Sequence, residues 1–83
     1  MNDIRKTIHA KIIKLARQLG HDARSLRYDQ EIPSAGILDS PALMELIMWF
    51  ENEFGLEVDQ DQLTLENFGT IDRMAAYEEK ARS

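Results

Sequence analysis

The sequence contains no cysteine, and this absence excludes disulfide bonds, thiolate metal sites and cysteine nucleophiles together. Any thiol chemistry in which the chain takes part must therefore be supplied by a cofactor. The chain also lacks any apolar run that approaches the ~18 residues of a membrane span. Its opening, Met1-Asn2-Asp3, does not show the basic-then-apolar order of a signal peptide, so we expect a cytoplasmic protein with no membrane partner.

Residues that could support catalysis are also scarce. Both histidines, His9 and His21, lie in the first quarter of the chain, and there is no Gly-x-Ser-x-Gly motif, so we expect no enzyme activity. Asp59-x-Asp61 is similar to the start of a calcium loop, but the ligand and glycine positions that should follow do not fit, and we expect no metal site. We interpret the paired carboxylates as solvated helix faces: Glu51 with Glu53, and Glu78 with Glu79.

Length and composition indicate one small folded domain over residues 1–83, with 43% hydrophobic and 30% charged residues. The formal net charge of -5 is divided unevenly. Residues 1–28 hold seven Lys or Arg and two Asp, whereas residues 29–83 hold three Lys or Arg and thirteen Asp or Glu. Most of this surface would repel a nucleic acid, and an acidic surface favours partners with basic docking patches.

The spacing of apolar residues predicts an all-α fold. One helix covers the first residues, because Ile4, Ile8, Ile12, Leu15 and Leu19 follow one stripe and Gly20 can end it. A long loop follows from position 21 to 39, held by a few apolar residues: Leu26, Ile32, Ile37 and Leu38.

A second helix is predicted from Ser40, which can cap it, and Pro41, which suits a first turn. Its core-facing residues are Leu43, Leu46, Ile47, Phe50 and Phe54, and Gly55 ends it. A single turn from Thr64 or Leu65 to Phe68 and a last helix capped by Thr70 complete the outline. The expectation is a four-helix bundle with a long loop between helices one and two and a short helix three.

A glycine, an acidic residue and a hydroxyl come together where the second helix begins, in Gly36-Ile37-Leu38-Asp39-Ser40. Together with Glu53-Phe54-Gly55-Leu56 and the stretch from Leu65 to Ile71, this motif resembles the acyl carrier protein superfamily over most of the chain. The likeness is greatest to free-standing peptidyl and aminoacyl carriers. The fold that the resemblance implies is the acyl-carrier bundle.

The resemblance implies a covalent 4'-phosphopantetheine arm on Ser40. Asp39, beside it, could orient the hydroxyl, aid the metal of the modifying enzyme or cap the helix itself, and we expect the first two roles together. The product phosphate would then lie at a helix N-terminus, where free N–H groups favour negative charge. The implied function is a non-catalytic carrier of a thioester-bound acyl or, in preference, aminoacyl group. The implied partners are a phosphopantetheinyl transferase, an adenylate-forming acyl or amino acid ligase, which includes ligases resembling aminoacyl-tRNA synthetases, and a downstream acyl-accepting enzyme. We expect the carrier to be a monomer.

Proline directly after the serine departs from carriers of fatty acid synthesis, which place leucine or a similar residue there. Counted from Pro41 at helical spacing, the outward residues of the second helix form our predicted docking face: Pro41, Met44, Glu45, Met48, Glu51 and Asn52. Trp49 and Phe50 add two large rings to this helix, so we expect little room for a long acyl chain and therefore a short cargo.

Two alternatives come from other classes of protein. The first is a small helical nucleic-acid binder that uses the basic first helix, namely Arg5, Lys6, Lys11, Lys14 and Arg17. The second is an interaction module in which Ser40 stays unmodified and the face of Met44 and Met48 binds a partner helix.

Overall fold

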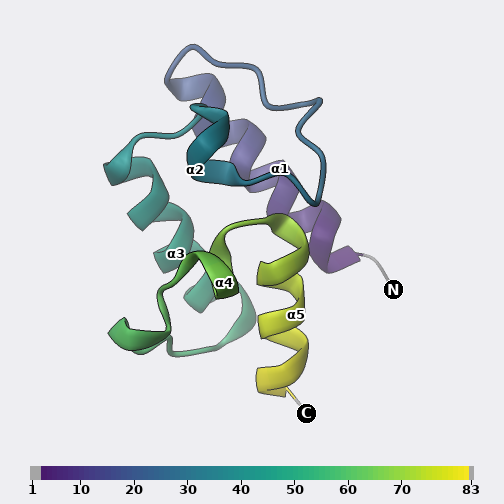
Figure 1. Cartoon of the computed structure of the whole chain (residues 1–83), viewed down its shortest axis with the longest axis vertical. Coiled ribbons are helices and arrows are strands. Elements are labelled where there is room, and N and C mark those ends of the chain that lie inside the picture. The colour runs from purple at the N-terminus through teal and green to yellow at the C-terminus, as the bar shows by residue number, and fades with distance from the viewer. Residues whose placement is uncertain (1–2, 83) are drawn as a thin grey trace.

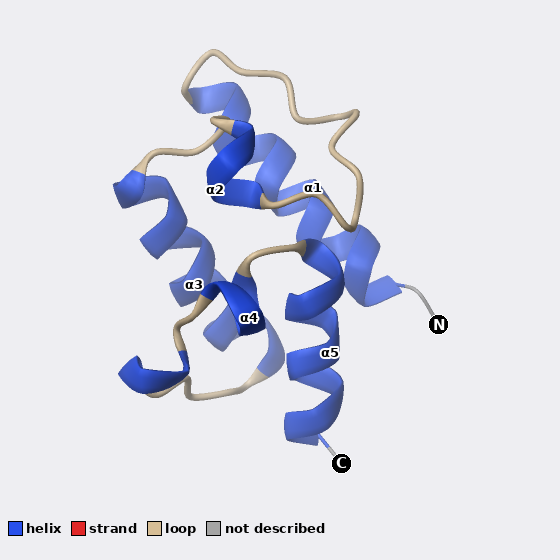
Figure 2. Ribbon diagram, viewed as in Figure 1, coloured by secondary structure: helices blue, strands red, loops and turns tan. Residues whose placement is uncertain are grey.

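Three long helices and three short ones make up the fold in the computed structural model, which describes residues 3–82 (Figure 1). The described residues contain no strand, and loops connect the helices (Figure 2). The all-α prediction is therefore confirmed. None of the described helices combines the length and the apolar character needed to cross a membrane. The elements are α1 (Asp3–Gln18), α2 (Ile32–Ala35), α3 (Ser40–Phe54), the 3-10 turn η1 (Gln60–Gln62), α4 (Leu65–Phe68) and α5 (Ile71–Arg82).

Helix α1 packs against both α3 and α5. Its apolar stripe is buried as predicted at Ile8, Ile12 and Leu15. Leu19 differs, because α1 ends at Gln18 and the chain turns away there, so that 39% of Leu19 stays exposed. Gly20, with φ of 83°, provides the left-handed conformation that the turn requires.

The predicted long loop exists, but it contains one more helical element than expected. Residues 32–35 form the single turn α2, which begins at the fully buried Ile32 and contains Pro33 in its first turn. Leu26 and Leu38 are also buried, and Ile37 is partly buried. The apolar residues thus hold the connection to the helices as predicted. Within residues 3–82 the fold has four α-helices and the 3-10 turn η1 besides α2.

Helix α3 supplies the centre of the core through Leu46 and Phe50. The ring of Phe50 is completely buried and meets Phe54 at 5.1 Å and Phe68 at 5.4 Å between centroids. Phe68 in turn contacts Tyr77 of α5 at 4.8 Å. These aromatic contacts connect α3, α4 and α5, and side chains fill the interior beside α3.

The last two helices begin at threonine caps. The Thr64 hydroxyl accepts the N–H of Asn67 at the start of α4, and the Thr70 hydroxyl accepts the N–H of Arg73 at the start of α5. The predicted cap at Thr70 is thereby confirmed. Along α5 the buried residues are Ile71, Met74 and Glu78.

The interpretation of Glu78 as part of a solvated face is wrong. Only 4% of the residue is exposed, because it lies on the same side of α5 as Ile71 and Met74. Both of its carboxylate oxygens accept hydrogen bonds from Nε of Arg82, one turn later, at 3.2 and 3.0 Å. The guanidinium is partly exposed and brings a counter-charge to the buried carboxylate.

Candidate functional site

The chain approaches Ser40 through a left-handed glycine and a buried leucine. Gly36, with φ of 69°, ends α2 and turns the chain. Leu38 is then buried, while Asp39 and Ser40 are exposed, so that the chain rises from the core to the surface within two residues. Ser40 is the first residue of α3, which is held rigidly by Leu46 and Phe50 in the core. The site thus joins an exposed hydroxyl to a fixed helix.

The cap of α3 is Asp39, which was one of the roles considered for this residue, and not Ser40, which was expected to cap the helix. Asp39 adopts an extended backbone, and its Oδ1 accepts the N–H of Ala42 at 2.9 Å. A carboxylate accepts this N–H at the spacing that a cap requires, and Pro41 in the first turn has no N–H that would need a partner. The carboxylate of Asp39 is therefore engaged with the helix and does not hold the Ser40 hydroxyl.

This arrangement frees the hydroxyl of Ser40. Within residues 3–82 the hydroxyl has no hydrogen-bond partner, and the residue is exposed. Because Asp39 performs the capping, modification of Ser40 would remove no hydrogen bond from the helix. If Ser40 were the cap, its hydroxyl oxygen would accept an N–H of the first turn, and modification of that oxygen would disturb this hydrogen bond.

Because Asp39 caps α3, fewer free N–H groups surround Ser40 than we expected for the site of a phosphate. Pro41 has no N–H, the N–H of Ala42 is bound by Asp39, and the N–H of Leu43 is bound by the Asp39 carbonyl at 2.9 Å. Few donors are left in the first turn for an added anion. A phosphate here would extend into solvent, and the fold would contribute little to its stability beyond the helix dipole.

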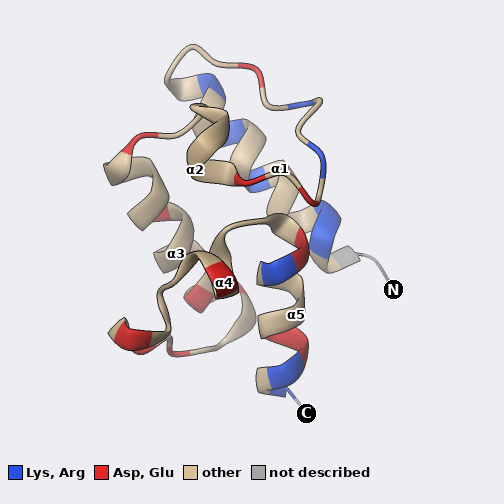
Figure 3. Ribbon diagram, viewed as in Figure 1, with Lys and Arg blue, Asp and Glu red and all other residues tan. Residues whose placement is uncertain are grey.

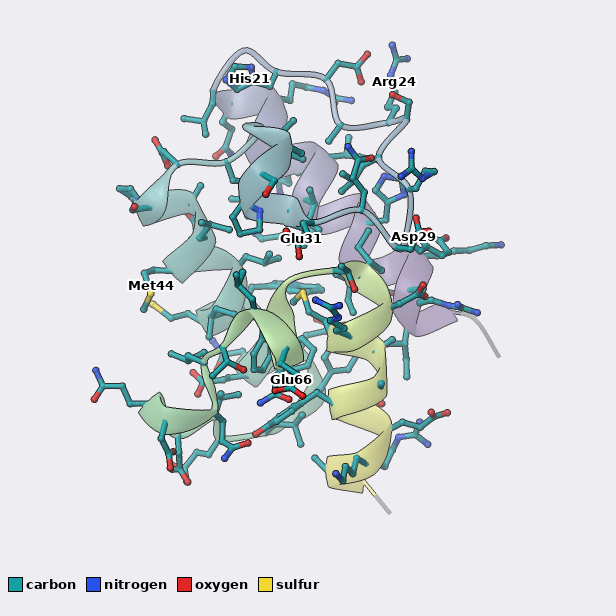
Figure 4. The ribbon with its side chains drawn as sticks, in the orientation of Figure 1. His21, Arg24, Asp29, Glu31, Met44 and Glu66 are labelled. Atoms are coloured by element: carbon teal, nitrogen blue, oxygen red, sulfur yellow. The ribbon has the colours of Figure 1, made fainter. Side chains whose placement is uncertain are left out.

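Most of the predicted docking face is exposed on α3. Met44 is 52% and Met48 57% exposed, which are high values for large apolar side chains, and Met44 projects away from the helices (Figure 4). The other exposed members of this face are Pro41, Glu45 and Asn52.

Glu51 does not belong with them. It is only partly exposed, and its Oε2 accepts the N–H of Val58 at 2.8 Å. The backbone carbonyl of Glu51 also accepts the N–H groups of Gly55 and Leu56, so that this residue fixes the turn after α3. The interpretation of Glu51 as part of a solvated face overlooked this structural role, and the docking role of Glu51 stays a prediction.

A shallow apolar groove of about 230 Å³ borders the docking face, between α2, α3 and α4. Met44 lies on one side of it, and Leu65, which is 55% exposed, lies on the other. Sequence reasoning did not assign Leu65 to this surface. An apolar residue at the first position of a four-residue helix, one turn before Phe68, is a signal that could have been used. The groove is lined by Pro33, Leu43, Met44, Leu46, Ile47, Leu63, Thr64, Leu65 and Phe68.

Charge around this surface is mainly negative. From position 28 to 79 the sequence contains a single cation, Arg73, and α3 contains none. Figure 3 shows acidic segments on α3, on α4 and in the chain between them, with basic segments on α1 and the loop that follows it. A partner that contacts α3 therefore meets methionine side chains within a negative field.

An all-helical domain that presents a serine at the first turn of its central helix, after a long anchored loop, has the construction of an acyl carrier domain. The family model described as phosphopantetheine attachment site matches residues 13–77 of this chain. The chain belongs to this family. A search of curated proteins found no match.

Membership in the family defines the cofactor and the class of activity. Its domains carry covalent 4'-phosphopantetheine and act as carriers of acyl groups without being enzymes. A phosphopantetheinyl transferase and acyl-handling enzymes are the partners that such a carrier requires.

Proposed function

We propose that Ser40 is the residue that bears the phosphopantetheine arm, and that the loaded carrier delivers an aminoacyl group between separate enzymes. The observation that carries the first part is the Ser40 hydroxyl, which is exposed, has no hydrogen-bond partner within residues 3–82, and lies inside the region matched by the family. Its attachment to the first turn of α3 gives the arm a rigid base. The residues present therefore fit the cofactor.

The attachment is a phosphoryl transfer from coenzyme A. The Ser40 oxygen forms a bond to the phosphorus that carries the pantetheine, the pyrophosphate P–O bond breaks, and adenosine 3',5'-bisphosphate leaves. The hydroxyl proton passes to a base of the transferase. Within residues 3–82 no side chain is hydrogen-bonded to the Ser40 hydroxyl, and Oδ1 of Asp39 is engaged as the helix cap. In this proposal the base and the metal ion therefore both come from the transferase. The attached arm supplies the thiol that the cysteine-free chain lacks, and this thiol holds the cargo as a thioester.

Packing next to α3 supports a short cargo. Phe50 is completely buried among Phe54, Phe68 and Tyr77, so large aromatic rings occupy the interior beside α3. The groove between α3 and α4 is open and measures only about 230 Å³. An aminoacyl group suits a surface of this size, and its length does not require burial. The loading partner in this proposal is an adenylate-forming amino acid ligase, with ligases resembling aminoacyl-tRNA synthetases among the candidates.

The docking surface of this proposal is the exposed side of α3, with Met44, Met48 and Glu45 as its principal contacts. Methionine side chains adapt to differently shaped partners, and a carrier must visit at least three enzymes in turn. Glu45 and the neighbouring acidic field orient partners that have basic patches.

The decisive experiment is intact-mass measurement after incubation with coenzyme A and a broad-specificity transferase. The wild-type chain should gain the mass of one phosphopantetheine, and Ser40→Ala should gain none. Ser34→Ala is the matched control, because Ser34 is also exposed, in α2, and should not change the result. Equal modification of Ser40→Ala and the wild type would reject Ser40 as the attachment residue. A mass spectrum of protein from its native host would then identify the cargo.

A further inference from the structure

Three cations of α1, namely Lys6, Lys14 and Arg17, differ from the arginines that the fold holds in ion pairs. Five arginines form ion pairs with carboxylates: Arg5 with Asp72, Arg24 with Asp22, Arg27 with Asp29, Arg73 with Glu31, and Arg82 with Glu78. By contrast, Lys6 and Lys14 make no ion pair within residues 3–82, and Arg17 has a longer-range attraction to Asp22 but forms no ion pair. The sequence between Ile4 and His21 contains no acidic residue at all.

These unpaired cations lie on one exposed side of α1. Positions 6, 10 and 14 follow each other at four-residue steps, and position 17 lies three residues further on, so Lys6, Ala10, Lys14 and Arg17 share a helix face. All four residues are exposed, whereas Ile8, Ile12 and Leu15 on the other side of α1 are buried. We call this face the basic stripe. At the helical rise per residue it extends over roughly 16 Å.

Folding alone does not account for the basic stripe. Cations near the C-terminal end of α1, such as Arg17, interact favourably with the helix dipole, but Lys6 is near the opposite end, where the dipole disfavours it. Lys14 and Arg17 are also like charges at three-residue spacing, which weakens a helix slightly. A binding partner that supplies carboxylates would remove both penalties.

The stripe is separate from the docking face on α3. Its residues point away from the side of α1 that packs on α3 and α5. Figure 3 shows basic segments along α1, while acidic segments lie on α3, on α4, in the chain between them, in the loop after α1 and on α5. An enzyme bound to Met44 and Met48 would therefore leave the stripe open to a second molecule.

We propose that the basic stripe is a second docking surface, and that its partner is a protein with a short acidic helical segment. The chemistry of the stripe matches glutamate or aspartate at every fourth position of a helix, and the small exposed side chain of Ala10 lets the partner approach closely between Lys6 and Lys14. An extended polyanion fits less well, because the net charge of -5 repels it wherever it reaches beyond the stripe. This inference goes beyond the carrier function and does not depend on Ser40.

The test is a nuclear magnetic resonance titration of the full chain with a synthetic helical peptide that has Glu at every fourth position. The expected result is shifts of the backbone amides along the exposed side of α1, with no change at Met44 and Met48. A peptide with Gln in place of Glu should not bind. The double variant Lys6→Gln/Lys14→Gln should weaken binding by about fivefold, on the scale of two exposed ion pairs.

A matched control keeps the charge change constant. Arg24→Gln/Arg27→Gln also removes two positive charges, but these arginines already pair with Asp22 and Asp29, so binding should weaken by less than about twofold. Equal weakening by the two double variants would overturn the proposal in favour of a net-charge effect. Tighter binding of a DNA duplex or of phosphatidylglycerol vesicles than of the peptide would also overturn it. So would concentration-dependent sedimentation that Lys6→Gln/Lys14→Gln abolishes, since the partner would then be a second copy of this chain.

Discussion

The carbonyl oxygen of Tyr28, in the connection between α1 and α2, accepts the backbone N–H of Asp72 in the first turn of α5 at 3.0 Å. The N–H groups of a first helical turn have no partner within their own helix, and here the long loop supplies one. Four residues further along, the N–H of Ile32 donates to the carbonyl of Gly69 at 2.7 Å. The loop that leads to Ser40 is therefore bonded to the junction of α4 and α5.

Side chains strengthen the same junction. Arg5 of α1 donates to the carboxylate of Asp72 at 2.8 Å, and its guanidinium lies 5.3 Å from the ring centroid of Tyr28. Residues from α1, the loop and α5 thus meet at one place. This explains how a connection of this length keeps the approach to Ser40 in a defined position.

Gly69 is expected to be the most sensitive glycine of this junction. A Cβ atom added there would fall against the backbone carbonyl of Leu65, to which the Gly69 N–H is bonded, and the main chain would have to shift. Gly69→Ala should lower the free energy of unfolding by about 1–3 kcal/mol. Urea denaturation, monitored by the fluorescence of Trp49, would measure this loss in the free energy of unfolding. Gly20→Ala is the comparison, because a Cβ at Gly20 meets no atom within 4 Å and only its positive φ opposes the change. A smaller loss for Gly69→Ala than for Gly20→Ala would contradict the steric explanation.

The assignment of the α3 cap gives a second prediction. Asp39→Ala removes the acceptor for the N–H of Ala42 and should lower the free energy of unfolding by about 1 kcal/mol. Ser40→Ala should change the free energy of unfolding by less than about 0.5 kcal/mol. Substitutions at exposed positions that take no part in a helix cap or a buried hydrogen bond have small effects on stability. Thermal denaturation of both variants by circular dichroism separates the two roles. If Ser40→Ala were the more destabilising, the serine would be the cap.

The cap also shows which features the sequence could predict. The positions of α1, α3 and α5 follow from apolar spacing, because Ile8, Ile12, Leu46 and Phe50 face one core. The choice between Asp39 and Ser40 as the cap does not follow, since both residue types are good caps and their backbone angles decide.

Tertiary contacts explain the other differences between the predicted and the observed structure. Glu51 has the helical spacing of an outward residue, yet the turn after Gly55 brings the N–H of Val58 to its carboxylate. Glu78 is charged but continues the stripe of Ile71 and Met74, and Arg82 makes its burial possible. The helical turn α2 was missed because Ile32 is held by a bond to Gly69, which is far away in the sequence.

Glu51 provides the third prediction. Glu51→Ala leaves the N–H of Val58 without its acceptor and should lower the free energy of unfolding by about 1 kcal/mol. Glu45→Ala removes the same charge from an exposed position on the same helix and should have almost no effect on stability. Hydrogen exchange of the Val58 amide gives an independent readout and should become faster only in Glu51→Ala. Unchanged exchange in that variant would show that the bond is not formed in solution.

A fourth prediction concerns the pH dependence of Asp22. Hydrogen bonds from the side chain and the backbone of Arg24 lower the pKa of Asp22 from 3.8 to about 2. Because the folded pKa is the lower one, the stabilisation is complete above pH 3.8 and is lost as the pH falls through about 2. Carbon-detected titration of Asp22 should show the low pKa in the wild type. In Arg24→Gln the pKa should return toward 3.8, and a value that stays near 2 would assign the shift to another group.

The exposed methionines of α3 give the last prediction. Met48→Asp places a carboxylate in the proposed docking face, and should lower kcat/KM of the phosphopantetheinyl transferase for this carrier by roughly tenfold, on the scale of one lost interface contact. The folded state should be unaffected, because 57% of Met48 is exposed. Leu19→Asp is the matched control, since Leu19 is also an exposed apolar residue, at the end of α1, and the same substitution there should leave kcat/KM unchanged. Met44→Asp should resemble Met48→Asp if both side chains belong to one surface. Equal losses for Leu19→Asp and Met48→Asp would mean that added negative charge, and not the α3 face, controls recognition.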